Sequence, residues 1–291
     1  MKKGLGTLFV IIAGICWGLI SIFVHGLNGA GMGSFDIMFV RTFIAIVLMF
    51  VVLLIFKREL LKISIKDIWM FIGTGIISLT FFTYCYFTTI VNVGAATAVV
   101  LLYTSPIFVM LLSALFFKER ITIKKVAALV MTFAGCLLVA GIIGGGEKMT
   151  LASFFLGLCA GIGYALYSIF AGFAVKKYSS ITITFYTFLF SGISLLALPM
   201  LLNPVEVVSR MVSPGLILYS VGIAVVCTVV PYITYTIGLS KMEKSRAAVL
   251  VTVEPLVGTL IGIFVWKESA DPLKLLGIVL IFAAVTMLSA E

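Results

Sequence analysis

The sequence is poor in charge: only 11% of its 291 residues are charged, whereas 63% are apolar. A typical soluble domain is about 25% charged and about 45–50% apolar. A soluble core cannot absorb this excess, so we expect an integral membrane protein with the lipid bilayer as its main partner. The basic residues are dispersed in short runs between apolar spans, which argues against nucleic-acid binding.

Residues typical of several kinds of site are also missing. The five cysteines lie inside apolar runs without C-x-x-C spacing, and there is one histidine, so neither a metal site nor a disulfide is expected. The chain has no HExxH motif or His/Asp cluster, which disfavours a membrane-embedded enzyme. The absence of a GxxxxGK[ST] loop excludes direct ATP drive within this chain, and no cofactor is expected. A channel would need rings of charge or a filter loop, which the sequence does not suggest.

What the chain does have is long apolar runs separated by short polar connections. About 20 apolar residues cross a bilayer, and the pattern predicts ten such helices. They cover roughly 5–25, 36–56, 67–90, 95–117, 123–143, 151–174, 181–201, 214–239, 245–266 and 272–289. The first run is longer than the apolar part of a signal peptide, which spans about 7–15 residues, so we expect it to be a retained span.

Lysine and arginine are distributed unequally between the two sides of these helices. Fifteen of the 20 fall on the side at which odd-numbered helices begin, and five fall on the other. Cytoplasmic loops carry the excess of positive charge in membrane proteins. The bias therefore predicts a multi-pass protein of the cell membrane with both termini in the cytoplasm.

The chain also repeats itself. The stretches 96–119 and 245–268 match at a constant offset of 149 residues. The matched residues are Pro106 with Pro255, Lys118 with Lys267, and Glu119 with Glu268. We therefore expect an N-terminal five-helix repeat over residues 1–146 and a C-terminal one over residues 147–291, joined near the glycine run 144–146.

Because five is an odd number, the second repeat must be inserted upside down relative to the first. Inverted repeats are a recurring plan of secondary transporters, whose substrate site lies near the midplane at the repeat interface. The expected fold class is an all-α integral membrane protein of ten transmembrane helices, arranged as two inverted five-helix repeats around a central cavity.

The most informative residue is Glu254, which directly precedes Pro255 in the ninth span. A charge near mid-membrane costs about 2.5–3.5 kcal/mol on insertion scales, so it is normally retained for function. One hypothesis is a carboxyl that faces the cavity and binds a cationic group or a proton. The alternative is a neutral or paired glutamate that satisfies the backbone freed by the proline.

Further candidates lie at one-turn spacing on several helices, where they would share a face. They are Trp17, Ser21 and His25 in the first helix, Tyr84 in the third, Tyr164 and Tyr167 in the sixth, and Tyr232 and Tyr235 in the eighth. A wet central cavity would explain these stripes together, although ordinary core packing remains open for each aromatic residue. Tyr103 and Ser105 lie at the break in the fourth helix. Pro106, Pro231 and Pro255 are expected to take part in gating.

Two other charged or titratable residues have open alternatives. Arg41, in the second helix, could hold an anionic group of the substrate such as a carboxylate, or it could be an interfacial residue that snorkels to the membrane surface. His25 could sense pH or simply lie at the interface. Ser105 is the positional counterpart of Glu254, so the two repeats are not expected to bind a ligand symmetrically.

With these residues in view, the chain resembles the ten-helix, EamA-type branch of the drug/metabolite transporter superfamily. The resemblance rests on A-G-I-C-W-G at residues 13–18, Arg41, the P-x-F…K-E pattern of 106–119 and the E-P-L-V-G…W-K-E pattern of 254–268. It implies a transporter of small organic solutes, such as amino acids and related metabolites, in the bacterial inner membrane. It also implies that helices 1, 3, 4, 6, 8 and 9 surround the cavity.

The predicted function is therefore a secondary active transporter that moves a small organic metabolite by alternating access, with proton-coupled export as one option. Its expected partners are a small-molecule substrate, the bilayer and, in that option, protons. A membrane-embedded enzyme and a passive facilitator or channel are the alternatives.

Overall fold

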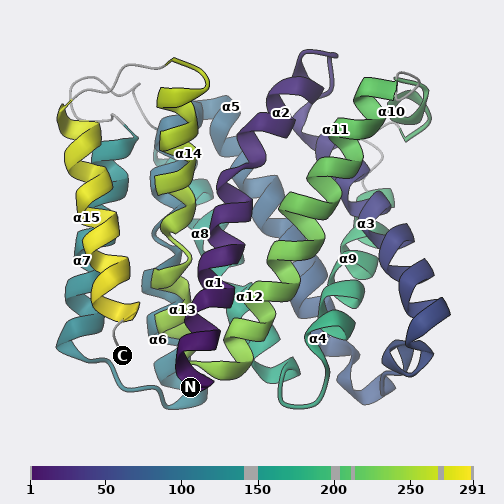
Figure 1. Ribbon diagram of the computed structural model, residues 1–291, viewed down its shortest axis with the longest axis horizontal. Helices are drawn as coiled ribbons and strands as arrows, with labels where there is room; N and C mark the ends of the chain where they lie inside the picture. Colours follow the sequence, from purple (N-terminus) through teal and green to yellow (C-terminus); the bar gives the residue numbers. More distant parts are fainter. Residues whose placement is uncertain (1, 141–149, 198–203, 211–213, 268–271, 290–291) are drawn as a thin grey trace.

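The computed structural model describes residues 2–140, 150–197, 204–210, 214–267 and 272–289. Within these ranges the chain is helical, with short turns and no strand (Figure 1). The helices up to residue 140 are α1 (Lys2–Gly18), α2 (Ile20–Asn28), α3 (Ser34–Phe56), α4 (Ile68–Ile72), α5 (Phe81–Leu102), α6 (Ser105–Phe117) and α7 (Ile123–Val139). Those after residue 150 are α8 (Leu151–Ala174), α9 (Ser180–Leu196), α10 (Pro204–Arg210), α11 (Pro214–Ala224), α12 (Val230–Lys241), α13 (Lys244–Leu250), α14 (Val253–Phe264) and α15 (Pro272–Ser289).

Eight of these helices, or runs of successive helices, are long and apolar enough to cross a membrane. They are Gly4–Asn28, Ser34–Phe56, Ile65–Ala95, Thr97–Phe117, Leu151–Ala174, Pro214–Lys241, Lys244–Phe264 and Pro272–Ser289. The other two expected spans coincide with α7 and α9, which are 17 residues long each. The chain is thus a multi-pass membrane protein, while the count of ten spans stays a prediction. The expected repeat boundary at 146/147 and Glu268 lie outside the described residues.

The third and fourth spans meet at a sharp turn rather than in a loop. The turn occurs at Gly94, whose φ of 78° and ψ of 160° are not helical. Glycine adopts such a backbone readily because it has no Cβ. The single helix α5 therefore contains the end of one span and the beginning of the next.

The spans that carry Pro106 and Pro255 are both interrupted a few residues before the proline. Tyr103 and Thr104 form the break between α5 and α6. Val251 and Thr252 form the break between α13 and α14. A proline provides no N–H for the preceding turn and its ring crowds that turn, so the helix opens there. The hydroxyls of Thr104 and Thr252 each donate to a carbonyl three residues earlier, at 2.6 and 2.5 Å.

Other local features recur at the same offset in the chain. Lys118 and Lys267, 149 residues apart, are the two described non-glycine residues with positive φ, at 56° and 59°. Two π-helical segments, Gly73–Thr80 and Val225–Val229, interrupt the third and eighth spans at corresponding positions. Wide π turns of this kind are rare and often occur at functional sites.

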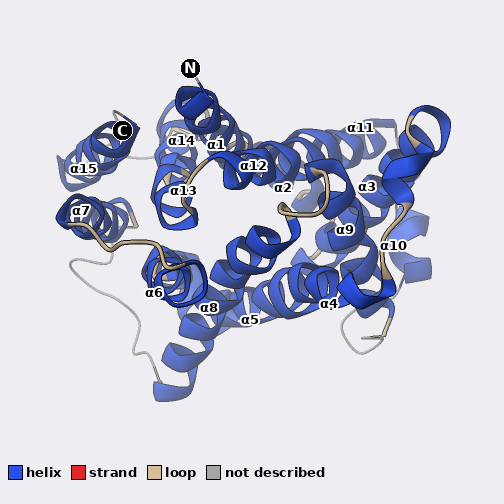
Figure 2. Cartoon of the chain, turned by 90° about the horizontal axis from the view of Figure 1, so that it is seen from below, coloured by secondary structure: helices blue, strands red, loops and turns tan. Residues whose placement is uncertain are grey.

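The helices form a bundle whose core passes between the two parts of the chain. α1 packs along α12 and α14, α5 along α8, and α7 along α15. Figure 2 shows α7 and α15 side by side at one edge of the bundle. α1 begins and α15 ends at the same end of the bundle, which we call the terminal face (Figure 1). The other end is the opposite face.

Close approach of α1 to α14 depends on two glycines. A Cβ added at Gly14 would lie 2.4 Å from Val253 Cγ1, and one at Gly18 would lie 2.6 Å from Val257 Cβ. Small residues at one-turn spacing are the usual means by which membrane helices approach this closely. Gly14 and Gly18 therefore position the half-helix that begins next to Glu254.

We expect Gly18→Ala to lower stability by about 1–3 kcal/mol, because overpacking a fitted contact forces backbone shifts. Gly4→Ala is the matched control on the same helix, since nothing lies within 4 Å of a Cβ there. Thermal unfolding of the detergent-solubilised protein measures both variants. Equal melting temperatures for them would contradict the assigned packing.

Candidate functional site

A cavity of about 490 Å³ lies inside the bundle. Eight of the residues expected from the sequence line it: Trp17, Ser21, Arg41, Tyr103, Tyr164, Tyr232, Glu254 and Pro255. They come from α1, α2, α3, the break between α5 and α6, α8, α12 and α14, so both parts of the chain contribute to one space.

Glu254 lies in the first turn of α14, just after the break in the ninth span. Its carboxylate lines the cavity, and the hydroxyl of Tyr164 donates to Oε2 at a long distance of 3.3 Å. No backbone N–H among the described residues donates to this carboxylate, so its orientation differs from that of a glutamate that merely repairs the proline break. A carboxylate has about four acceptor positions, which leaves Glu254 with capacity for a cationic ligand or a proton.

Two basic side chains, Arg41 and Lys274, line the same cavity. The guanidinium of Arg41 makes no hydrogen bond or ion pair with another described residue. An arginine carries five N–H donors in a planar fork that matches a carboxylate or phosphate. Lys274, near the start of α15, was not predicted from the sequence. Its only signal there is that it lies 149 residues after another lysine, Lys125.

Ser21 supplies a further unused polar atom. Its hydroxyl is buried and has no hydrogen-bond partner among the described residues. Buried polar groups are normally satisfied, so this hydroxyl is an exception next to the cavity. It has almost no accessible surface, so Arg41, rather than Ser21, leaves donors available to a bound solute.

Tyr167 and Tyr235 do not line the main cavity. They pack beneath it, towards the terminal face, around Trp17 and Tyr232, with the ring centres of Trp17 and Tyr235 5.5 Å apart. Their hydroxyls are already satisfied: Tyr167 hydrogen-bonds Thr236 at 2.8 Å, and Tyr235 hydrogen-bonds Ser168 at 2.8 Å. This aromatic cluster forms the floor of the cavity.

Tyr84 points away from the cavity. Its side chain is 41% exposed and its ring faces Phe35 at 6.5 Å. Thr88, on the same face, donates its hydroxyl to the carbonyl of Tyr84 at 2.8 Å. A threonine satisfied by its own helix needs no wet surroundings, so the polar stripe on this helix did not identify the cavity face. That face consists instead of Phe82, Thr83, Tyr86 and Phe87.

The remaining candidates also lie outside the cavity. The ring of His25 stacks on Trp266 at 4.2 Å, towards the opposite face. Ser105 and Pro106 are buried at the start of α6, and Pro231 is buried at the start of α12. They occupy helix breaks, where a backbone hinge would be located, but the cavity lining does not include them.

The same protein-family model matches residues 4–141 and residues 151–290, and its description is "EamA-like transporter family". The chain belongs to the EamA-like transporter family. This confirms the resemblance inferred from the motifs around Trp17, Pro106 and Glu254.

Relatives of this transporter are similar over nearly their full length. An uncharacterized transporter of Archaeoglobus fulgidus is 27% identical over 96% of this chain and 94% of its own. The pseudopaline exporter CntI of Pseudomonas aeruginosa is 25% identical over 98% and 95%. A solved crystal structure superimposes on 97% of this chain and 95% of its own with a TM-score of 0.80, at 17% identity, and shares the fold. The family and these names indicate a membrane transporter rather than an enzyme.

Proposed function

We propose that this membrane transporter is a secondary active transporter, which moves a small zwitterionic metabolite such as an amino acid or a related solute by alternating access. The observation that carries the proposal is the cavity itself. It brings the carboxylate of Glu254 together with the cationic Arg41 and Lys274, and it is lined by aromatic and small polar side chains. Such a mixture of apolar walls with a few convergent polar groups is typical of a small-molecule site.

Both signs of charge in the lining support this substrate class. Arg41 and Lys274 favour an anionic group, and Glu254 favours an ammonium. A molecule with both groups would pair with Glu254 and Arg41 together, whereas a simple amine would leave the guanidinium of Arg41 without an anionic partner among the described residues. The volume of about 490 Å³ suits a small metabolite rather than a large amphiphile.

Alternating access is supported by the internal symmetry. The family model matches twice. The left-handed residues Lys118 and Lys267 recur at the offset of the sequence repeat, and the two π segments end at that offset, at Thr80 and Val229. We take the two parts of the chain to be inverted repeats, so that rocking one against the other would expose the cavity at each face in turn. The breaks before Pro106 and Pro255 would supply the hinges.

Glu254 would also couple transport to protons if it carried either a proton or the ammonium of the substrate. Among the described residues its one hydrogen-bond partner is Tyr164, at a long distance, which leaves that exchange open. Export is the direction in the name of the Pseudomonas relative, and we propose the same direction here. The lysine bias supports a cytoplasmic terminal face, and we propose the bacterial inner membrane as the location.

We expect purified protein to melt at a higher temperature in the presence of zwitterionic amino acids than in the presence of simple amines or sugars. A ligand that binds only the folded state stabilises it by mass action, by about 2.7 kcal/mol at 100 times its dissociation constant. A thermal-shift screen with matched sets of amino acids, their decarboxylated amines and their deaminated acids measures this. A ranking led by the amines would contradict the assigned substrate class.

The same screen separates the alternatives when it is followed by flux into proteoliposomes. An enzyme would return a chemically changed solute, which mass spectrometry of the internal volume detects. A channel would give single-channel conductance in a planar bilayer. A transporter moves an unchanged solute at a rate that saturates with its concentration.

A further inference from the structure

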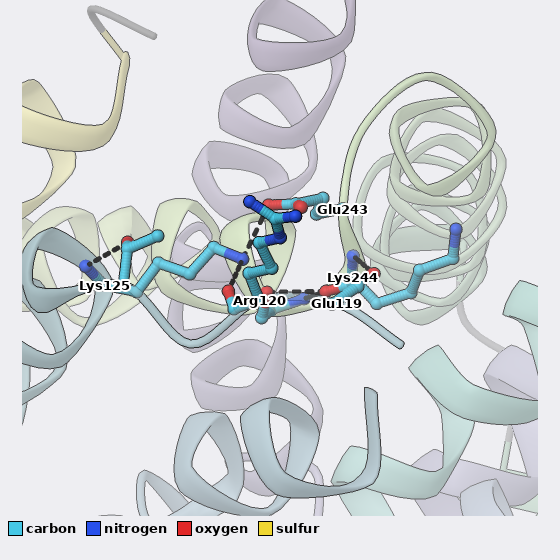
Figure 3. Close-up of polar contacts among 7 residues, drawn as sticks. Glu119, Arg120, Lys125, Glu243 and Lys244 are labelled. Carbon is cyan, nitrogen blue, oxygen red and sulfur yellow. Dashed lines mark hydrogen bonds and ion pairs between the residues drawn. The ribbon is translucent and has the colours of Figure 1, made fainter. Parts of the chain in front are cut away.

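The terminal face of the bundle is closed by polar contacts between two turns that are far apart in the sequence. One turn follows α6 and contains Glu119, and the other precedes α13. The carboxylate of Glu119 accepts from the N–H of Lys244 at 2.7 Å, and from both the N–H and the hydroxyl of Ser245 at 3.1 and 2.6 Å (Figure 3). One side chain thus holds the beginning of another span.

A second contact lies beside the first. The ammonium of Lys125, at the start of α7, forms an ion pair with Glu243 at 2.6 Å and donates to the carbonyl of Arg120 at 2.8 Å. The Lys125 side chain is only 3% exposed. A buried charge that lost its partner would be strongly destabilising. Lys125 and Glu243 can therefore separate only if water reaches both side chains at the same time.

Local backbone geometry explains why Glu119 reaches α13. Lys118 ends α6 in the left-handed conformation, which turns the chain out of the helix axis directly before Glu119. The first N–H groups of a helix have no partner within it. The residue that precedes α13, Glu243, makes no capping hydrogen bond with its own side chain. Glu119 provides that cap from across the bundle, with charge-assisted hydrogen bonds.

These contacts lie on the far side of the helix breaks from the cavity. α13 continues through the break at residues 251–252 into α14, which carries Glu254. Between the cap and the break, Ala248 of α13 is buried against Val109 of α6. The cavity extends the other way, to Ala140, which directly follows α7, and to Lys274, in the first turn of α15. Figure 1 shows that α7 ends and α15 begins at the opposite face. The contacts at the terminal face are therefore made in a conformation in which the cavity extends towards the opposite face.

We propose that Glu119 and Lys125 form a latch that is made only while the terminal face is closed, and that this latch sets the balance between the two access states. This inference rests on the alternating access proposed above. An interaction that exists in one state and not in the other shifts their populations by its full differential free energy. Opening the terminal face would separate α6 and α7 from the start of α13, which would break the hydrogen bonds of Glu119 with Lys244 and Ser245 and the ion pair of Lys125 with Glu243.

Cysteine labelling tests the latch without knowledge of the substrate. On a background without the five native cysteines, Ala248→Cys reports on the terminal face, because Ala248 is 5% exposed. Ser21→Cys reports on the cavity. We expect Glu119→Gln, and independently Lys125→Met, to accelerate labelling of Ala248→Cys by about tenfold, since the first variant removes the charge from the hydrogen bonds of Glu119 and the second removes the ion pair with Glu243. Labelling of Ser21→Cys should stay equal or become slower, because the two access states exclude each other.

Glu59→Gln is the matched control. Glu59 also lies at the terminal face, in a short 3-10 helix that follows α3, but its pairing with Lys57 spans 3.9 Å between largely exposed side chains. Unchanged Ala248→Cys labelling in both latch variants would overturn the proposal. Faster labelling at both reporter positions would also overturn it, because Glu119 would then support the fold as a whole.

Reagent added to one face of the membrane at a time also shows on which side of the membrane the terminal face lies. If the latch proposal is contradicted, the thermal-shift test of the proposed substrate class is unaffected.

Discussion

Glu254→Gln is expected to reduce the affinity for the transported solute about 10- to 100-fold and to remove any pH dependence of transport. Glutamine keeps the size of the side chain and one acceptor oxygen but cannot carry charge. A hydrogen bond to a charged group contributes about 1.5–3 kcal/mol, and Glu254 is the acidic residue in the lining of the cavity. The variant should fold normally, since the long hydrogen bond from Tyr164 is the one that the carboxylate makes within the described part of the chain.

Uptake or exchange of the solute identified by the thermal-shift screen, measured in proteoliposomes at several pH values, checks this expectation. Tyr164→Phe is the matched variant, because it removes the 3.3 Å hydrogen bond and keeps the charge. It should reduce transport far less than Glu254→Gln does. Wild-type rates and an unchanged pH profile in Glu254→Gln would remove Glu254 from the mechanism.

Arg41→Met is expected to weaken substrate binding about as much as Glu254→Gln does, but only for solutes that carry an anionic group. The guanidinium lines the cavity without a hydrogen bond or ion pair to another described residue, so its removal should cost little stability. A bidentate pair with a carboxylate would be lost, which weakens binding of a zwitterion about 10- to 100-fold. Binding of the corresponding decarboxylated amine should be unchanged or stronger.

Arg41→Lys distinguishes charge from geometry. Lysine keeps the positive charge but lacks the planar fork, so it should restore part of the affinity and not all of it. Titration calorimetry of the amino acid and its decarboxylated amine against wild type and both variants measures the difference. An equal loss for both ligands in Arg41→Met would show that Arg41 supports the site structurally and does not bind the anionic group.

Much of the fold followed from patterns that are local in the sequence. The span expected over residues 151–174 is helix α8, Leu151–Ala174, because a run of apolar residues of bilayer length has few alternatives in lipid. Glu254 was identified for a similar reason. A carboxylate next to a proline inside such a run is costly in any fold, so its presence already indicated a polar space, and the structure has a cavity there.

The orientation of a helix about its own axis was harder to predict. Tyr84 belongs to a polar stripe at one-turn spacing, yet it is directed outwards, and Tyr86 takes its place in the cavity. Hydroxyls that bond to the carbonyls of their own helix look the same in sequence as hydroxyls that line a cavity. The π segment before α5 adds to this difficulty, because each wide turn rotates the residues that follow it relative to a regular helix.

The sequence by itself determined the membrane class, the family and the residue that carries negative charge into the bundle, since composition, spacing and the energetic cost of a buried charge are independent of the tertiary fold. Only the tertiary structure decided which side chains meet. Lys274 joins Arg41 and Glu254 in one cavity, and Glu119 caps a helix that begins 125 residues later in the chain. Such meetings depend on how helices pack across the bundle, and no local pattern encodes them.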